Sequence, residues 1–303
     1  MATAERSVAV VGLGQMGAPV AARLRAAGMR VLAFDVRPDV TAAIARENDL
    51  EAVREVADVA AAPTIVTVLP TGAHVAEVFD ALGDALQPGT LWIDMSSSAP
   101  ADTHALGRRL RDRGAQLIDA PLSGGVRRAW IGAVTIMVGG DDAAVAAAMP
   151  YLNAVGRSIH RTGSLGSGHA MKALNNAVAA AGLVAAGEAL GVAVRFGIDP
   201  AVFVEVINAS TGRNVATERK LPEHVLPRRF DSGFSLGLMI KDMGIACELA
   251  TGQHADADVL QRALDVCREA QRAYDREADH TEVVSWLLDH ESVQPRLTET
   301  PAT

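Results

Sequence analysis

The first candidate for chemistry is a glycine pattern near the start of the chain. Gly12, Gly14 and Gly17 are spaced as GxGxxG, between a run typical of a buried strand (SVAVVG) and a run typical of a helix (APVAARLRAAG). Glycines at this spacing permit a tight turn and let the backbone approach a pyrophosphate, whose charge would lie at the helix N-terminus. The pattern predicts a dinucleotide site, and a structural glycine turn without a ligand is the alternative. The residues expected to line it are Gly12, Leu13, Gly14, Gln15, Met16 and Gly17.

The next strand-like run indicates which dinucleotide would bind. MRVLAFD ends in Asp35, at about the spacing of ~20 residues at which a carboxylate accepts hydrogen bonds from the ribose hydroxyls. The same carboxylate would repel a 2′-phosphate, which favours NAD over NADP. Arg37 follows two residues later and is the residue type that NADP sites use, so NADP stays possible.

Two further strand ends supply candidate cofactor contacts. The runs TIVTVLP and TLWIDMS each end in a polar or proline-containing break. Ligands of doubly wound sheets bind outside the carboxyl ends of the strands, so Leu69, Pro70 and Ser97 are expected to touch the cofactor. An ordinary turn or a serine cap would explain each of these residues equally well.

A lysine in an apolar helix is the second candidate for chemistry. Between residues 161 and 195 the only formal charges are Lys172 and Glu188, and Lys172 opens a long apolar run. Lys172 and Asn176 are four residues apart, so their side chains project from one helix face. A lysine that extends its ammonium to water, with nearby asparagines capping backbone groups, would give the same pattern.

The elements that must position these residues follow a clear order. Up to about residue 161, strand-like runs such as TIVTVLP and AQLIDAP alternate with helical runs such as ADTHALGRRLRDRG, which predicts a parallel sheet covered on both faces. Beyond residue 165 long helical runs replace the strands. We therefore expect an α/β chain: an N-terminal Rossmann-type doubly wound sheet at 1–164, joined by a long interdomain helix to an all-α substrate and oligomerisation domain at 165–293, and a loose tail at 294–303.

Composition argues against several kinds of protein. The net charge of −8 and the pI near 5.5 disfavour nucleic acid or an anionic membrane as the main partner. The uncharged stretch between Lys172 and Glu188 is shorter than the ~18–20 residues that a membrane span needs, and no signal-peptide pattern precedes the first strand. Cys247 and Cys267, without a CxxC motif, predict reduced thiols in a cytoplasmic protein, and the scattered histidines predict no metal site.

Four blocks stand in one order along the chain: VGLGQMGAPVAARL at 11–24, DAPLSGGVRRAWIGAVTIMVGG at 119–140, GHAMKALNNAV at 168–178 and FSLGLMIKDMGIA at 234–246. Together they resemble the β-hydroxyacid dehydrogenase family, which includes 3-hydroxyisobutyrate dehydrogenase, tartronate semialdehyde reductase and, more distantly, 6-phosphogluconate dehydrogenase. The likeness covers nearly the whole chain and fades after about residue 290. One glycine motif carries little weight, whereas four blocks in order are specific.

The resemblance implies roles for the central residues. Ser123, Gly124 and Gly125 would hold the substrate carboxylate and hydroxyl, since glycines expose backbone N–H groups and serine adds a hydroxyl donor. A turn that needs positive φ would explain the glycines but not the serine. Lys172 would exchange a proton with the substrate oxygen during hydride transfer, which requires burial or a neighbouring cation to lower its pKa toward neutrality. Asn176 would orient the reacting hydroxyl.

Three residues of the second half also receive implied roles. Lys241 would lie near the nicotinamide and substrate and repel the Lys172 ammonium; a solvated lysine paired with Asp242 is the alternative. Phe234 matches a substrate-pocket position, for which a core aromatic is the alternative. Arg213, in STGRN, would clamp a second polar or anionic group of the substrate.

The expected function is hydride transfer between NAD, with NADP possible, and a small 3-hydroxy acid such as 3-hydroxyisobutyrate, or reduction of the matching semialdehyde. Small-residue helix faces such as AAAGLVAAG, like the resemblance itself, favour a homodimer or homotetramer. One rival is an NADP(H)-preferring semialdehyde or imine reductase of the same fold, and Lys172 argues against imine reduction. The other rival is a non-catalytic dinucleotide-binding protein, although the lysine and the Ser-Gly-Gly segment are both retained.

Overall fold

The computed structural model describes residues 6–289, so the expected tail at 294–303 lies outside the described residues. The chain forms two compact units that divide inside one helix, between Asn175 and Asn176. The boundary expected between residues 164 and 165 falls just before that helix begins, and those domain limits stay a prediction.

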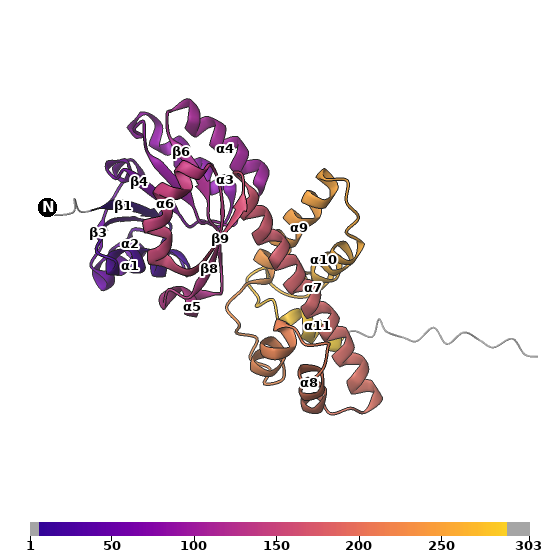
Figure 1. Ribbon diagram of the computed structural model, residues 1–303. Helices are drawn as coiled ribbons and strands as arrows, with labels where there is room; N and C mark the ends of the chain where they lie inside the picture. Colours follow the sequence, from indigo (N-terminus) through magenta and orange to yellow (C-terminus); the bar gives the residue numbers. More distant parts are fainter. Residues whose placement is uncertain (1–5, 290–303) are drawn as a thin grey trace, which may run out of the picture. The chain divides into compact units, whose positions relative to one another are not determined.

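The first unit is built on a mostly parallel sheet (Figure 1). Its strands run in the order β3-β2-β1-β4-β5-β6-β8-β7, with β9 paired to β8. All neighbours from β3 to β6 are parallel, whereas β8 is antiparallel to both β6 and β7. The bounds are β1 (Ser7–Val11), β2 (Arg30–Phe34), β3 (Glu51–Ala52), β4 (Thr64–Thr67), β5 (Leu91–Asp94), β6 (Gln116–Asp119), β7 (Leu122–Ser123), β8 (Val134–Gly139) and β9 (Gly156–Gly163).

Helices cover both faces of this sheet because each central strand is apolar on both sides. Val8 and Val10 of β1 face one core, while Ala9 and Val11 face the other. The alternation follows from the two-residue repeat of a strand, and the doubly wound fold predicted from the sequence is confirmed. The covering elements are α1 (Gly17–Ala26), α2 (Pro38–Asn48), η1 (Val56–Ala61), α3 (Gly72–Leu82), η2 (Gly83–Ala85), α4 (Pro100–Asp112), α5 (Val126–Trp130) and α6 (Asp142–Val155).

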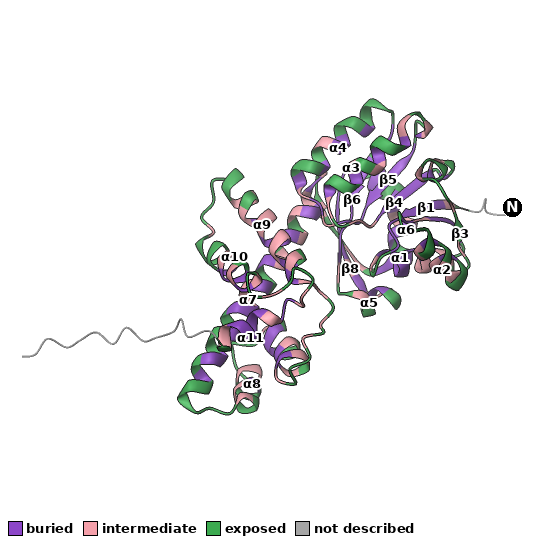
Figure 2. Cartoon of the chain, turned by 180° about the vertical axis from the view of Figure 1, so that it is seen from behind, coloured by how far each residue is buried: buried purple, intermediate pink, exposed green. Residues whose placement is uncertain are grey.

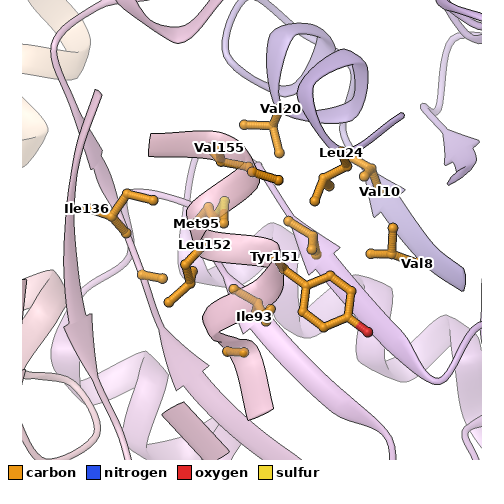
Figure 3. Close-up of a cluster of buried hydrophobic side chains, with 14 of the residues drawn as sticks. Val8, Val10, Val20, Leu24, Ile93, Met95, Ile136, Tyr151, Leu152 and Val155 are labelled. Carbon is orange, nitrogen blue, oxygen red and sulfur yellow. The ribbon is translucent and has the colours of Figure 1, made fainter. Parts of the chain in front are cut away.

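The core beneath α1 and α6 fixes the sheet edge that matters for binding. Figure 3 shows Leu24 of α1 and Leu152 of α6 directed toward Val10 and Ile93 of the strands. Each of these side chains is fully buried, which stabilises the fold by roughly 1.5–3 kcal/mol per side chain. The central strands β1, β4 and β5 are almost continuously buried (Figure 2). The carboxyl ends of β1 and β4 therefore rest on a rigid platform.

The strand order reverses between β1 and β4, since β1 lies between β2 and β4. In an open α/β sheet such a reversal leaves a crevice outside the carboxyl ends of the two strands, and ligands bind there. Gly12 directly follows β1, and Val68 directly follows β4. The predicted dinucleotide loop thus stands at this point.

The second unit contains helices and one isolated bridge, between Ser235 and Asp279, within its described residues. The long helical runs expected beyond residue 165 are confirmed. Leu183, Leu190 and Leu221 are at the centre of one of its cores. The bounds are α7 (Ser167–Phe196), which begins in the first unit, α8 (Pro200–Asn208), the π-helix η3 (Ala216–Val225), α9 (Leu236–Gly252), α10 (Asp258–Gln271) and α11 (Glu282–Asp289).

Helix α7 is long and apolar enough to meet the length and composition test for a membrane span. Its best 18-residue window has a mean hydropathy of 1.9, and half of that window is buried within the structure. A core helix of a water-soluble protein passes the same test, so the expected absence of a membrane partner stays a prediction.

Both cysteines are free thiols. Cys267 is fully buried on α10, and burial raises the pKa of its thiol to about 12. Cys247 is half-buried on α9, and burial raises the pKa of its thiol as well. Neither sulfur is therefore a reactive thiolate at neutral pH, and the cytoplasmic location inferred from the cysteines stays a prediction.

Candidate functional site

The glycine loop after β1 has the geometry that a dinucleotide needs. Gly12 has φ +92°, and a Cβ there would lie 2.4 Å from the Val68 carbonyl oxygen. A Cβ on Gly17 would lie 1.8 Å from the Gly12 oxygen, so only glycine permits α1 to begin so close to the strand. By contrast, no atom lies within 4 Å of a Cβ built on Gly14. The backbone at Gly14 therefore has open space where a pyrophosphate would approach.

The N-terminus of α1 also suits an anion. Met16 precedes the helix without a side-chain cap, and no acidic residue lies in the first turn. The positive end of the helix dipole is consequently not neutralised by a carboxylate of its own helix. Loop geometry and helix charge together fit a dinucleotide pyrophosphate, held by residues 12–17.

Asp35 lies beside this loop, as the sequence predicted for a ribose-binding carboxylate. It is 8% exposed; its Oδ2 accepts the Leu13 N–H at 2.9 Å, and its Oδ1 accepts both N–H and Nε–H of Arg37 at 3.0 Å. Burial alone would raise the pKa of Asp35, but the hydrogen bonds from Arg37 and Leu13 outweigh it, so the pKa lies below its usual value. The group is thus a carboxylate at neutral pH, and it is already paired with Arg37.

The three serines that follow β5, at positions 96–98, differ in burial. Ser96 and Ser98 are buried: Ser96 accepts the Leu69 N–H at 2.9 Å, and Ser98 donates to Asp94 at 3.0 Å. Ser97 is half-buried. Of the three serines it is the least buried, and Pro70 is exposed in the same region. The cofactor contacts expected of Ser97 and Pro70 stay predictions.

The Ser-Gly-Gly segment joins β7 to α5. Ser123 pairs with Thr135 of β8 and is half-buried, and the two glycines adopt φ +139° and +76°. Positive φ accounts for Gly124 and Gly125 by backbone conformation alone. The same turn leaves nothing within 4 Å of a Cβ on Gly125. The chain therefore presents backbone and a serine hydroxyl together, which suits a carboxylate.

Lys172 and Asn176 lie one turn apart on α7, and both are half-buried. Asn176 Nδ2 donates to Asp242 Oδ2 at 2.6 Å, and Asp242 on α9 is 3% exposed. This bond fixes the amide, so its carbonyl oxygen has a defined direction. Asp242 was not predicted as a site residue; the only signal for it in the sequence is its place beside Lys241.

Lys241 forms an ion pair with Asp242, with Nζ 3.2 Å from Oδ1 and a side chain only 22% exposed. The pairing proposed as the alternative is present, but the lysine is not fully solvated. Asp242 offsets the Lys241 charge, and the like-charge repulsion between Lys241 and Lys172 stays a prediction.

Phe234 and Arg213 occupy different environments. The Phe234 ring packs edge-on against His280, with centroids 5.6 Å apart, and its carbonyl accepts the His280 N–H. Arg213 is exposed and lies 3.5 Å from Glu218. The substrate contacts expected of both residues stay predictions.

Two buried residues of the first unit were also not predicted. Asp119, at the end of β6, accepts N–H groups of Gly166 and His169, and His169 is 1% exposed. Both lie inside blocks that carried the resemblance. A polar residue at a strand end or helix start is usual, so the sequence gives no signal that these two meet across 50 positions.

Two family models match consecutive parts of the chain. The NAD-binding domain of 6-phosphogluconate dehydrogenase matches residues 7–163, and the NAD-binding domain of NADP-dependent 3-hydroxyisobutyrate dehydrogenase matches residues 166–287. Together they account for nearly all the described residues.

Individual relatives agree with these models. The chain is 34% identical to 2-(hydroxymethyl)glutarate dehydrogenase of Eubacterium barkeri, over 80% of this chain and 83% of the relative. It is 33% identical to NAD-dependent L-serine dehydrogenase of Pseudomonas aeruginosa, over 94% and 98%. The solved 3-hydroxyisobutyrate dehydrogenase of Mycobacterium tuberculosis with L-serine superposes with a TM-score of 0.85 at 31% identity, over 93% and 99%. The chain therefore belongs to the β-hydroxyacid dehydrogenase family and is an NAD(P)-dependent hydroxyacid dehydrogenase.

Proposed function

We propose that this enzyme transfers a hydride between NAD and a 3-hydroxy acid that carries a primary alcohol, with Lys172 as the general acid and base. Three substrates named in the relatives, 2-(hydroxymethyl)glutarate, L-serine and 3-hydroxyisobutyrate, share one unit. Each is a 2-substituted 3-hydroxypropanoate, HOCH2–CH(R)–COO⁻. The proposed substrate class is this unit, with the group R left to the rest of the pocket.

The observation that supports the proposal most is that lysine is rare in this chain and occurs only at half-buried positions. Of 28 Lys and Arg residues only Lys172, Lys220 and Lys241 are lysines, and all three are half-buried. Arginine serves every exposed cationic position among the described residues, yet it cannot release a proton in this pH range. A lysine kept at position 172 therefore suits proton exchange better than simple charge pairing.

The residues divide the reaction into binding and proton transfer. Ser123 and the N–H groups of Gly124 and Gly125 hold the substrate carboxylate, and Asn176, fixed by Asp242, orients the hydroxyl. NAD, held through its pyrophosphate by residues 12–17, would supply the hydride acceptor for oxidation of the alcohol carbon and, as NADH, the hydride donor for reduction. The neutral Lys172 amine takes the hydroxyl proton as the carbonyl forms, and in reduction the ammonium gives that proton to the carbonyl oxygen.

Two substitutions at Lys172 test the chemistry. Lys172→Ala removes the amine, and Lys172→Arg keeps a positive charge that cannot exchange a proton near neutral pH. Both are expected to lower kcat for a 2-substituted 3-hydroxypropanoate by about 10²- to 10⁴-fold.

In the wild type, oxidation should accelerate with rising pH and reduction should slow, because the two directions need opposite protonation states of the Lys172 amine. NADH formation and consumption at 340 nm report both.

Lys220→Ala is the matched control, since Lys220 is a second half-buried lysine outside this site. It should leave kcat unchanged and NADH affinity intact. Turnover by Lys172→Ala at the wild-type rate would remove the proposal, as would a substrate panel in which secondary alcohols such as 3-hydroxybutyrate react better than the primary ones.

The proposal includes assembly into a homodimer or homotetramer through α7. Apolar side chains recur along this helix at alternate spacings of three and four residues, and Met171, Leu174, Val178 and Val192 are 40–66% exposed. We define the α7 stripe as Met171, Leu174, Val178, Ala181, Ala185 and Val192. It extends over about 30 Å of helix. The exposed Glu188 stands on the same face between Ala185 and Val192, so the uncharged part of the stripe runs from Met171 to Ala185. A second copy of the same helix matches that part in length and spacing.

A further inference from the structure

Asp119 joins the two chain segments that carry Ser123 and Lys172. It is the last residue of β6, shortly before Ser123, and it is 0% exposed. Its Oδ1 accepts the Gly166 N–H at 2.7 Å, and its Oδ2 accepts the His169 N–H at 2.8 Å. These N–H groups belong to the start of α7, where a carboxylate is most favourable for the helix dipole.

Two glycines bring the helix into direct contact with this carboxylate. A Cβ on Gly168 would lie 2.4 Å from the Met137 carbonyl oxygen and 2.8 Å from Asp119 Oδ2, and a Cβ on Gly139 would lie 2.5 Å from Asp119 Oδ1. Real Cβ atoms do not approach so closely, so glycine is needed at both positions. The first turn of α7 therefore rests on β6 and β8 with no room for a methyl group.

The His169 side chain connects the same turn to a helix by a hydrogen bond and lies near the end of a second strand. Its buried ring has Nδ1 2.7 Å from the Thr103 hydroxyl on α4 and Nε2 3.7 Å from Asp94 Oδ2 at the end of β5. Asp94 is held in turn by the Ser98 hydroxyl. The start of α7 is thus hydrogen-bonded to β6 through Asp119 and to α4 through Thr103, and these polar groups are all buried.

We propose that Asp119 is a positioning residue of the hydride-transfer reaction: by holding the first turn of α7 on the strand that leads to Ser123, it sets where Lys172 lies relative to Ser123. The inference rests on the proposed function, since it needs Lys172 to exchange the proton and Ser123 to hold the substrate. Lys172 follows His169 by three residues, so a shift of the first turn moves the amine as well. A misplacement of about 1 Å at a reacting group costs up to about 100-fold in rate.

Asp119→Asn tests this role with almost no change of shape. One of the two atoms facing α7 becomes an NH2 donor, which opposes a backbone N–H instead of accepting it. The single-turnover rate of NADH formation, at saturating NAD and hydroxy acid, should fall about 10- to 100-fold, with the NADH dissociation constant changed less than about twofold. A purely stabilising role would lower the melting temperature and leave the rate of the folded enzyme unchanged.

Asp199→Asn is the matched control, because Asp199 caps α8 by accepting the Ala201 N–H at 2.7 Å. The same chemical change at that helix should leave the single-turnover rate unchanged. The double variant of Asp119→Asn with Lys172→Ala should be no slower than Lys172→Ala alone, since Asp119 acts through Lys172.

The two proposals fail in different ways. A folded Asp119→Asn enzyme with the wild-type rate, beside an inactive Lys172→Ala enzyme, overturns the positioning role and leaves the proposed function standing. Wild-type turnover by Lys172→Ala overturns the proposed function. If Asp119→Asn does not fold, Gly168→Ala decides: it keeps the carboxylate but displaces the helix, so a matching loss of rate supports the role and an unchanged rate overturns it.

Discussion

At the scale of single residues, we expect the pairing of Asp35 with Arg37 to influence the choice between NAD and NADP. The carboxylate is held ionised by its hydrogen bonds, and both of its oxygens face donors of this chain. An ionised Asp35 repels a 2′-phosphate. It also keeps the Arg37 guanidinium beside itself, where it is less able to bind that phosphate. We therefore expect this one carboxylate to favour NAD over NADP in two ways.

Asp35→Asn should shift the ratio of kcat/KM for NAD to that for NADP by about tenfold toward NADP, which corresponds to about 1.4 kcal/mol. The amide no longer repels the phosphate and releases Arg37 to bind it. Adding Arg37→Gln to Asp35→Asn should cancel most of the gain. Parallel steady-state assays with the two cofactors measure the ratio, and an unchanged ratio in Asp35→Asn would contradict this account.

The role of a single residue could be predicted from the sequence where its residue type itself requires a particular backbone geometry, as glycine does. Gly12 and Gly17 are glycines because of a positive φ and a close approach, which the spacing of the motif already implied. Asp119 and His169 could not be assigned, because their roles arise only when β6 and α7 meet. The Asn176–Asp242 bond is a similar case, since it joins positions 66 residues apart.

Several elements of the second unit meet around one buried histidine. His280 precedes α11; its Nδ1 lies 3.1 Å from the Phe234 carbonyl oxygen, ahead of α9. The titratable groups that act on its pKa are Lys220 and His224 of η3 and Asp279. Burial and the nearby Lys220 lower the pKa of His280 to about 4, against the attraction of Asp279. The folded unit therefore holds this histidine neutral.

The low pKa of His280 makes stability depend on pH. Between pH 6.5 and about 4 the unfolded chain binds a proton that the folded chain does not, so the free energy of unfolding falls as the pH falls through this window. The loss attributable to His280 reaches about 3 kcal/mol at the acid end. His280→Gln should remove most of it, as measured by urea unfolding at pH 7 and pH 5.

His160→Gln provides the comparison, since His160 is exposed on β9. Its pH profile should follow that of the wild type. Parallel losses of stability in His280→Gln and the wild type between pH 7 and 5 would show that the imidazole is not responsible.

Elements were predictable where their apolar residues repeat at a standard period. The strands of the sheet and helices α8, α9 and α10 follow periods of two or 3.6 residues. The π-helix η3 differs in its hydrogen bonds, because Leu226 N donates to Leu221 O five residues back, and the apolar spacing alone does not reveal this. Pro222 within it also argues against a helix on sequence grounds.

At the scale of the whole molecule, the exposed apolar stripe on α7 bears on the oligomeric state. Val178, at the middle of the α7 stripe, is 66% exposed, and an apolar helix face of this length is normally covered in a water-soluble oligomer. Val178→Glu would place a charge in that face, which is costly to bury without a partner. We expect the wild type to sediment as a dimer or tetramer and Val178→Glu to sediment as a 31.6 kDa monomer.

Val259→Glu is the matched control, since Val259 is 76% exposed on α10 and outside the α7 stripe. It should retain the wild-type sedimentation. A wild-type enzyme that is monomeric at micromolar concentration would rule out the assembly.

Because lysine is scarce in this chain, we expect the enzyme to resist covalent modification by an aldehyde product. A semialdehyde, the product of the proposed oxidation, condenses readily with primary amines to form imines, whereas guanidinium groups resist that condensation. The exposed cations of the described chain are arginines, and the three lysines are sheltered. An enzyme that releases an aldehyde in the proposed oxidation would therefore expose few lysine amines that the aldehyde could modify by imine formation.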